Sequence, residues 1–319
     1  MTHDLQALAR EIARELAAGD SRAGPVVPTT ETSRPVVRGS VPPGVSAAPG
    51  VSAPPGVTFV RQNARIADFI DHTLLKPEGT ARDIDTLCDE AREHRFAAVC
   101  VHPVWVARCA KRLGGSAVQV ATVIGFPLGA NSSETKRRES ALAVEHGATE
   151  VDMVAAIGHI KSGDWNHVAD DIAAVVEGAG GGGGGRLVKV IIESAALSPV
   201  EIIKACAIAR EMRAHYVKTS TGFHAAGGAS AEAVALMRLV VGDAMGVKAS
   251  GGVRDCEAAL RMIANGATRI GTSSGVSMAK CLGQGPLPLN DLLSLATQHA
   301  SGCATCATLP AGGSSAGPY

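Results

Sequence analysis

The chain of 319 residues has no net charge and no clustered basic stretch. Its 30 lysine and arginine residues are balanced by 30 aspartate and glutamate residues. Because a nucleic-acid-binding surface needs a concentrated basic face, we expect no nucleic-acid partner. The sequence also lacks an uninterrupted apolar run of about 18 residues, the length that a membrane helix requires. We therefore expect no membrane association.

The N-terminus lacks the pattern of a targeting segment. Asp4, Glu11 and Glu15 interrupt the opening MTHDLQALAREIAREL. A secretory signal has an apolar centre without such acids, and transit peptides are usually poor in acidic residues. We expect a cytoplasmic protein.

The eight cysteines are mostly single and scattered, which argues against a disulfide framework. The one close pair, Cys303 and Cys306, has neither a second cysteine pair nor a histidine pair, so a zinc or redox site is disfavoured. No set of His, Asp and Glu shows a familiar metal-ligand spacing, and no serine lies in a nucleophile elbow. We predict no metal and no cofactor. Six cysteines in apolar or periodic stretches are expected to be small buried thiols: Cys88, Cys100, Cys109, Cys206, Cys256 and Cys281.

Composition divides the chain into four parts. Apolar residues recur with helical period near the start, which predicts a helix within residues 1–19. The Pro- and Gly-rich repeat VPPGVSAAPGVSAPPGV indicates a disordered linker over 20–60. The end, LPAGGSSAGPY, indicates a flexible tail over 301–319. The folded domain is predicted to be 61–300.

Within this domain, short β-rich runs alternate with helical patterns. Nearly all-apolar strands separated by helices are typical of parallel sheets that are covered by helices. Eight such units predict an α/β protein with a (β/α)8 TIM barrel rather than an open doubly wound sheet. The predicted strands are 69–73, 97–103, 118–126, 150–157, 187–194, 216–221, 246–250 and 268–274.

Two segments between the predicted strands have sequence features that predict their local structure. Asn131 precedes Glu134 by three residues, close to a capping box, and marks the start of a helix over 132–146. The glycine run 180–185 is predicted in a helix-to-strand loop. This loop would lie opposite the expected active site, where an insertion costs little.

Lysines in two neighbouring predicted strands are the main functional signal. Lys218 interrupts the apolar run HYVKTST, and Lys248 lies in GVKAS. In a barrel, reactive residues come from the C-terminal ends of strands. Burial and a like charge both lower the pKa of a lysine, which gives the free amine that a Schiff-base nucleophile needs. The alternative is that both lysines pair with acids or reach solvent, but Asp152 two strands away favours chemistry.

Further candidates lie at other strand ends and in the following loops. Glycines and serines after the sixth, seventh and eighth strands are typical of a barrel's phosphate site, where backbone N–H groups face the anion. These features predict imine chemistry on a small phosphorylated substrate. The phosphate candidates are Gly222, Gly251, Gly252, Gly271, Ser273 and Ser274, and the pocket candidates are Asp71, Thr73, Cys100 and Thr219.

Seven motifs closely resemble the deoxyribose-phosphate aldolase family, and the likeness covers about residues 66–285. It implies a class I aldolase that interconverts 2-deoxy-D-ribose 5-phosphate with acetaldehyde and D-glyceraldehyde 3-phosphate. It also implies a homo-oligomer. The motifs are IDHTLLKP, VIGFPLG, EVDMV, KVIIE, VKTSTGF, VKASGGVR and RIGTSSG.

The resemblance also implies a role for each matched catalytic residue. The lysine of VKTSTGF, Lys218, forms the Schiff base. The lysine of VKASGGVR, Lys248, lowers the pKa of Lys218 and helps to move protons. Asp152 of EVDMV acts with Lys248 and a water molecule as a proton relay.

Two other functions are open on the residues alone. One is a different Schiff-base aldolase that acts on a phosphorylated ketose or keto acid, and the other is a non-catalytic sensor of phosphorylated ligands. The C-terminal Tyr319 is either a solvated end or a phenol that joins the proton relay when the tail folds over the barrel mouth.

Overall fold

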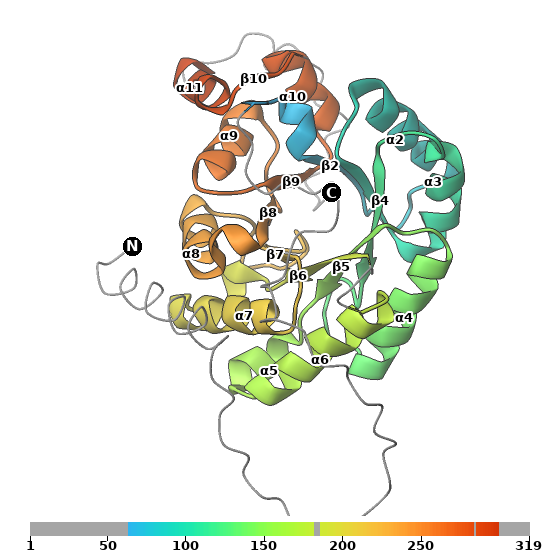
Figure 1. Ribbon diagram of the computed structural model, residues 1–319, viewed down its shortest axis with the longest axis vertical. Coiled ribbons are helices and arrows are strands. Elements are labelled where there is room, and N and C mark those ends of the chain that lie inside the picture. Colours follow the sequence, from blue (N-terminus) through green and yellow to red (C-terminus); the bar gives the residue numbers. More distant parts are fainter. Residues whose placement is uncertain (1–62, 182–185, 284, 300–319) are drawn as a thin grey trace, which may run out of the picture.

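The computed structural model describes residues 63–181, 186–283 and 285–299, all within the predicted domain 61–300. The predicted N-terminal helix, the linker and the tail with Cys303, Cys306 and Tyr319 lie outside the described residues. Eight parallel strands, β2 to β9, form a closed barrel in sequence order (Figure 1). The predicted (β/α)8 TIM barrel is confirmed.

Each predicted strand corresponds to one strand of the barrel. The strand β7 ends at Lys218, three residues before its predicted end, because the chain leaves the ladder there and Thr221 hydrogen-bonds to Glu193 instead. The barrel strands are β2 (Ile70–Leu74), β3 (Ala98–Val101), β4 (Gln119–Ile124), β5 (Glu150–Val154), β6 (Leu187–Ile191), β7 (Tyr216–Lys218), β8 (Gly246–Ser250) and β9 (Arg269–Thr272).

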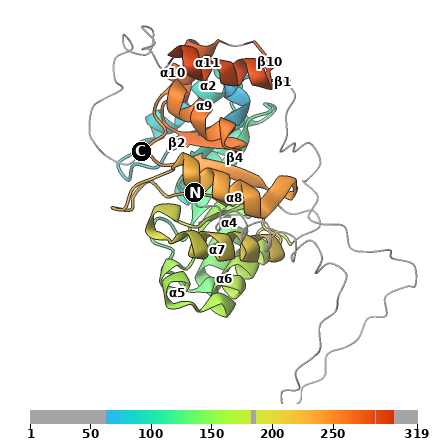
Figure 2. The same cartoon turned by 90° about the vertical axis from the view of Figure 1, so that its left-hand side faces the viewer.

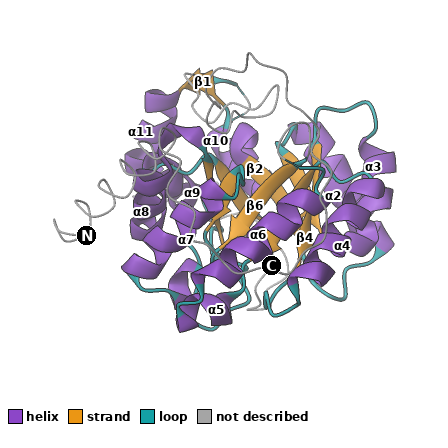
Figure 3. Ribbon diagram, turned by 60° about the horizontal axis from the view of Figure 1, so that its bottom comes forward, coloured by secondary structure: helices purple, strands orange, loops and turns teal. Residues whose placement is uncertain are grey.

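Helices surround the barrel (Figure 3). They are α2 (Ala81–His94), α3 (Val106–Leu113), α4 (Ser133–Glu145), α5 (Ile157–Ser162), α6 (Trp165–Gly178), α7 (Pro199–Glu211), α8 (Ala231–Val241), α9 (Cys256–Ala264), α10 (Gly275–Leu282) and α11 (Leu289–His299). Short 3-10 helices are η1 (Ile66–Phe69), η2 (Pro103–Trp105), η3 (Ser194–Ala196) and η4 (Gly242–Ala244). Among the described residues, no helix has both the length and the apolar character of a membrane span.

A small antiparallel pair, β1 (Asn63–Ala64) and β10 (Leu287–Pro288), joins the two ends of the described domain. Figure 2 shows this pair with α11 at one end of the molecule and α5 at the opposite end. The predicted glycine run falls between the end of α6 and the start of β6, and its residues 182–185 lie outside the described residues.

The helix α4 begins at Ser133, one residue later than predicted. Ser132, rather than Asn131, is the N-cap, because its extended backbone (ψ 151°) lets its hydroxyl accept a hydrogen bond from the N–H of Thr135 at 3.3 Å. A serine in this position satisfies one of the free N–H groups of the first helical turn.

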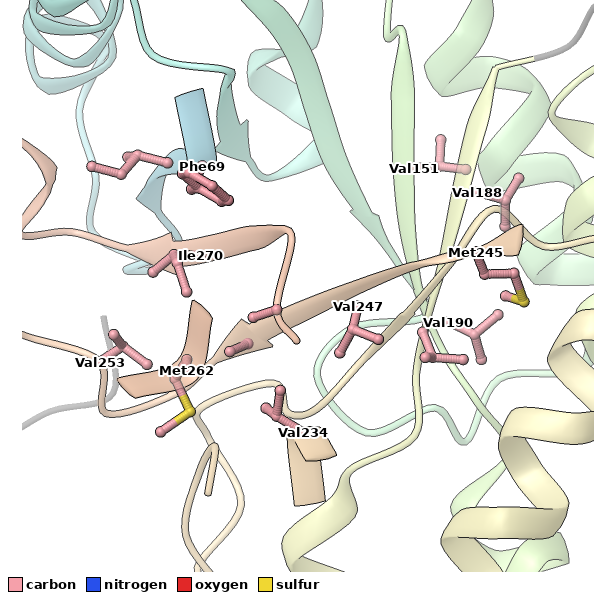
Figure 4. Close-up of a cluster of buried hydrophobic side chains, with 14 of the residues drawn as sticks. Phe69, Val151, Val188, Val190, Val234, Met245, Val247, Val253, Met262 and Ile270 are labelled. Atoms are coloured by element: carbon pink, nitrogen blue, oxygen red, sulfur yellow. The ribbon is translucent and has the colours of Figure 1, made fainter. Parts of the chain in front are cut away.

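The main apolar core lies between the strands and the helices. Figure 4 shows buried side chains from this layer, including Val151, Val188, Val190, Val247, Val234 and Met262. Because strand side chains alternate between two faces, the neighbours of these valines point into the barrel. There, β3 and β4 contribute small apolar residues, including Ala98, Cys100, Ala121 and Val123. The inward positions of the other strands are largely charged.

The predicted buried thiols agree with the structure. Five of the six cysteines are buried, and Cys281 is half-buried. No disulfide joins any of these six described cysteines.

A buried ion pair links α4 to α6 and to the end of β5. Lys136 donates hydrogen bonds from Nζ to Asp171 at 2.7 Å and to the carbonyl of Val154 at 2.9 Å, and both charged side chains are fully buried. Removing one partner leaves the other charge unpaired, which typically costs about 3–5 kcal/mol.

We therefore expect Asp171→Ala to lower the free energy of unfolding by about 3–5 kcal/mol in urea titrations. The exposed pair of Glu257 and Arg261 provides the control, and Glu257→Ala should cost less than about 1 kcal/mol. Adding Lys136→Met to Asp171→Ala should recover part of the loss. Equal losses for Asp171→Ala and Glu257→Ala would contradict this assignment.

Candidate active site

The carboxylate of Asp152 contacts three lysines inside the barrel. Its Oδ2 accepts hydrogen bonds from Lys218 at 2.9 Å and from Lys248 at 2.7 Å, and its Oδ1 accepts one from Lys189 at 2.8 Å. All four side chains are buried. Lys218 and Lys248 are register partners on β7 and β8. The structure thus brings together the three predicted catalytic residues and adds a third lysine.

The ion pairs continue around the barrel interior. Lys248 also contacts Asp71 at 2.5 Å, and Lys189 also contacts Glu150. Arg269 closes the network because its guanidinium binds Asp71 and also Glu150, the latter at 2.9 Å. Seven buried groups of alternating sign are therefore connected.

Lys189, Glu150 and Arg269 were missed as site residues by the sequence analysis. Each is a charged residue within a short, otherwise apolar strand, in LVKVI, EVDMV and RIGT. This is the signal that identified Lys218, so it was available for all three. Asp71, predicted only as a pocket residue, is a direct partner of Lys248.

The balance of charges in this network shifts the pKa values of the two predicted lysines in opposite directions. Four basic side chains face only three carboxylates, so full ionisation would leave one uncompensated buried positive charge. Burial, and then the charge of Lys248, lower the pKa of Lys218 although Asp152 opposes them. Burial also disfavours the charged form of Lys248, but the charges of Asp152 and Asp71 raise its pKa well above the ordinary value. Lys218 is therefore the lysine suited to be a free amine.

Two carboxylates of the network, Asp152 and Asp71, stay ionised. Burial raises the pKa of Asp152, but the charges of Lys189, Lys218 and Lys248 outweigh it and hold that pKa well below its usual value. Burial likewise opposes the ionisation of Asp71, but Arg269 and Lys248 lower its pKa to about 2. Asp152 thus offers a proton acceptor next to an ammonium donor, Lys248.

The other predicted pocket residues fix this arrangement. The hydroxyl of Thr219 donates to the carbonyl of Ser250 and accepts from its N–H, both at 3.0 Å, so the ends of β7 and β8 are joined. Thr73 donates to the carbonyl of Asp71 at 2.8 Å. Burial raises the pKa of the Cys100 thiol, which lies in the apolar half of the interior.

The predicted phosphate residues fall into two groups. Gly222, Gly251 and Gly252 lie in the loops after β7 and β8 with φ of 84°, 87° and 80°, in the left-handed region that favours glycine. The two loops touch, because a side chain at Gly251 would come within 3.3 Å of the α-carbon of Gly222. Ser273 is exposed directly after β9.

Gly271 and Ser274 differ from the expected arrangement. Gly271 lies inside β9, where its backbone is paired with both neighbouring strands. A β-carbon there would come within 2.4 Å of Ser250 Oγ, so this glycine makes room for the site rather than offering a loop N–H. The N–H of Ser274 donates to Thr272 Oγ1 at 3.0 Å and is already used.

Two buried serine hydroxyls lie beside the lysine strands, and no binding role was predicted for either from the sequence. The Oγ atoms of Ser220 and Ser250 have no hydrogen-bond partner among the described residues. Buried polar atoms are normally paired, so these two are suited to bind a polar ligand. Nothing in the sequence distinguishes them from serines with a partner in the protein.

Comparison with known proteins identifies the class. The sequence profile of the DeoC/LacD family aldolases matches residues 65–280. The chain belongs to this family of aldolases, which are lyases.

Individual relatives make the likeness more specific. The deoxyribose-phosphate aldolase of Brevibacillus brevis is 56% identical over 220 residues, which cover 68% of this chain and 97% of the relative. That of Thermotoga maritima is 52% identical, over 69% of this chain and 88% of the relative.

Solved structures agree with these relatives. A putative deoxyribose-phosphate aldolase from Coccidioides immitis superposes with a TM-score of 0.65 at 35% identity, covering 85% of this chain and 96% of that one. A tetrameric deoxyribose phosphate aldolase from Aeropyrum pernix gives 0.62 at 33% identity, covering 67% and 89%.

The charge of Lys248 should control the ionisation of Lys218. Because a like charge disfavours the ammonium form, Lys248→Met should raise the pKa of Lys218. The measurement is the pH dependence of imine trapping by borohydride with acetaldehyde, and its acid limb should move to higher pH. The exposed Lys280→Met is the control and should leave the profile unchanged. A shift to lower pH in Lys248→Met would contradict the proposed coupling.

Proposed function

We propose that this aldolase reversibly cleaves 2-deoxy-D-ribose 5-phosphate into acetaldehyde and D-glyceraldehyde 3-phosphate through a Schiff base on Lys218. The observation that carries the proposal is the sharing of one oxygen, Oδ2 of Asp152, by Lys218 and Lys248. Lys248 has a second carboxylate in Asp71 and stays charged, whereas Lys218 has none. The substrate assignment is supported by relatives 50–56% identical that are deoxyribose-phosphate aldolases.

The geometry supports the following steps. The amine of Lys218 attacks the aldehyde carbon C1 of the open-chain sugar, and loss of water gives an iminium ion. The C2–C3 bond then breaks, because its electrons can move into the iminium group as the C3 hydroxyl loses its proton. D-Glyceraldehyde 3-phosphate leaves, and an enamine remains on Lys218.

Proton transfer completes the cycle. Asp152 lies within hydrogen-bond distance of both Lys218 and Lys248, so Lys248 and Asp152 are placed to deliver a proton to C2 of the enamine through a water molecule. Hydrolysis of the resulting imine releases acetaldehyde and restores the amine. Lys189 and Arg269 contribute by holding Asp152, Glu150 and Asp71 in place.

The loops after β7, β8 and β9 are the proposed phosphate subsite. Gly222, Gly251 and Gly252 allow a close approach to the backbone, and Ser273 lies exposed beside them at the next strand end. The hydroxyls of Ser220 and Ser250 are proposed to bind sugar hydroxyls between this subsite and Lys218. Gly271 and Ser274 are not part of the proposed contact set, for the structural reasons given above.

We also propose that the protein acts in the cytoplasm as a homo-oligomer. The tetrameric relative from Aeropyrum pernix supports self-association without fixing the number of subunits here.

Borohydride reduction in the presence of acetaldehyde should add an ethyl group to Lys218, identified by peptide mapping. Lys218→Met should lose turnover and trapping, while its far-ultraviolet circular dichroism stays that of the parent. A main adduct on Lys248 would reverse the two roles. A substrate panel with phosphorylated ketoses and keto acids tests the substrate, and preference for one of those would refute the deoxy-sugar assignment.

Ser273→Glu should weaken the binding of the phosphorylated sugar, because a carboxylate near the phosphate repels it. We expect KM for 2-deoxy-D-ribose 5-phosphate to rise about tenfold or more, and KM for unphosphorylated 2-deoxy-D-ribose to change little. Ser162→Glu, at an exposed position of α5, is the control for the added charge. Equal losses for both sugars would mean that Ser273 does not face the phosphate.

A further inference from the structure

Two histidines and an aspartate meet where α5 ends and α6 begins, apart from the ion-pair network in the barrel. The ligand atoms of His159, Asp164 and His167 all lie within 4.8 Å of one another. The sequence analysis expected no metal ligands, because the spacing of these three residues matches no familiar motif. The fold brings them together through a turn between two helices.

Backbone hydrogen bonds hold this turn without any ion. Gly163, with φ of 73°, ends α5, and the N–H of Asp164 donates to the carbonyl of His159 at 3.0 Å. Asp164 is the N-cap of α6, where its Oδ1 accepts the N–H of His167 at 3.2 Å. The three side chains therefore start from fixed positions.

The three side chains already lie close together. His159 Nδ1 lies 3.0 Å from Asp164 Oδ2, and the rings of His159 and His167 stack with centroids 3.6 Å apart. In a tetrahedral zinc site with bonds of about 2.0–2.1 Å, ligand atoms lie about 3.3 Å apart. The stacked rings hold their nitrogens in nearly parallel planes, so ion binding requires the rings to rotate. The side chains of His159 and Asp164 are about half exposed, so an ion can reach them.

The chemistry of the three groups selects the kind of ion. Imidazole nitrogens suit zinc, copper and nickel, whereas calcium and magnesium prefer sites built from oxygen ligands alone. Two imidazoles and one carboxylate also match a common zinc ligand set in which water fills the fourth position.

We propose that His159, Asp164 and His167 bind one divalent transition-metal ion of the zinc type. The ion takes the place of the hydrogen bond between His159 Nδ1 and Asp164 Oδ2, and the single ring proton of a neutral His159 is then carried on Nε2. His167 supplies the second nitrogen. The site plays no part in imine chemistry, because it lies outside the network of Asp152.

A bound ion would join α5 to α6. The segment α5 follows β5, the strand that carries Asp152, and Lys161 already ties α5 to Glu201 of α7 at 2.9 Å. An ion at the other side of α5 would fix this short helix between its two neighbours. Ligands that bind only the folded state raise its stability, so the expected effect is a higher melting temperature.

The test is a titration of the full-length protein with Zn²⁺ by calorimetry and with Co²⁺ by absorption. Cys303→Ser and Cys306→Ser are introduced first, because a cysteine pair could bind the same ions. We expect one ion per chain. His159→Ala and His167→Ala should each weaken binding by at least about tenfold, the lower range seen for groups that only orient ligands. His146→Ala, at an exposed histidine after α4, is the matched control.

The melting temperatures and affinities of these variants show whether the ion binds at this site. Zn²⁺ should raise the melting temperature of the parent and of His146→Ala but not of His159→Ala or His167→Ala. Equal affinities in all variants, or a loss in His146→Ala as large as in the other two, would overturn the site. Imine trapping at Lys218 should be the same in every variant, so the failure of this proposal is distinguishable from failure of the proposed function.

Discussion

The arrangement of the barrel interior depends on the carboxylate of Asp152. Three ammonium groups approach its two oxygens in a space closed to solvent, where an isolated charge would be costly. Without this carboxylate, Lys218 and Lys248 would repel each other across adjacent strands. With it, two lysines can stay charged while the third is free to lose its proton. The same carboxylate thus holds the lysines in place and sets their ionisation.

The other residues of the barrel interior are arranged around this buried carboxylate and its lysines. A barrel core is usually filled by layers of branched apolar side chains. Here β3 and β4 supply small apolar residues, and the charged groups of the remaining strands occupy the other half. The apolar half excludes water near Lys218, which favours its neutral form. The charged half fixes the positions of Lys248 and Asp152, the groups proposed to move protons.

The fold was predictable because every strand is a short apolar run between helical patterns, and parallel strands buried on both sides require that pattern. The two predicted lysines and Asp152 were predictable because charge is rare in such runs. The same reasoning applied to Lys189 and Arg269 would have found the complete network. This reasoning could not predict which charged groups pair with each other. Pairing across the barrel depends on strand register and tilt rather than on local sequence.

The remaining errors arose where several local solutions were possible. Asn131 and Ser132 are both good caps, and only the backbone geometry selects the serine. Gly271 reads like a loop glycine in the sequence, yet it is a strand residue kept small by its neighbours. The histidines at the turn between α5 and α6 carry no recognisable spacing, because it is the turn that brings them together.

The lack of a side chain at Gly271 also bears on how this enzyme could be altered. Even a methyl group there would meet Ser250 Oγ at 2.4 Å and Lys248 Cε at 3.1 Å, so any replacement displaces at least one of these two side chains. A substitution at Gly271 therefore changes the geometry around Lys248. Variation aimed at new aldehydes is better placed in the neighbouring loops.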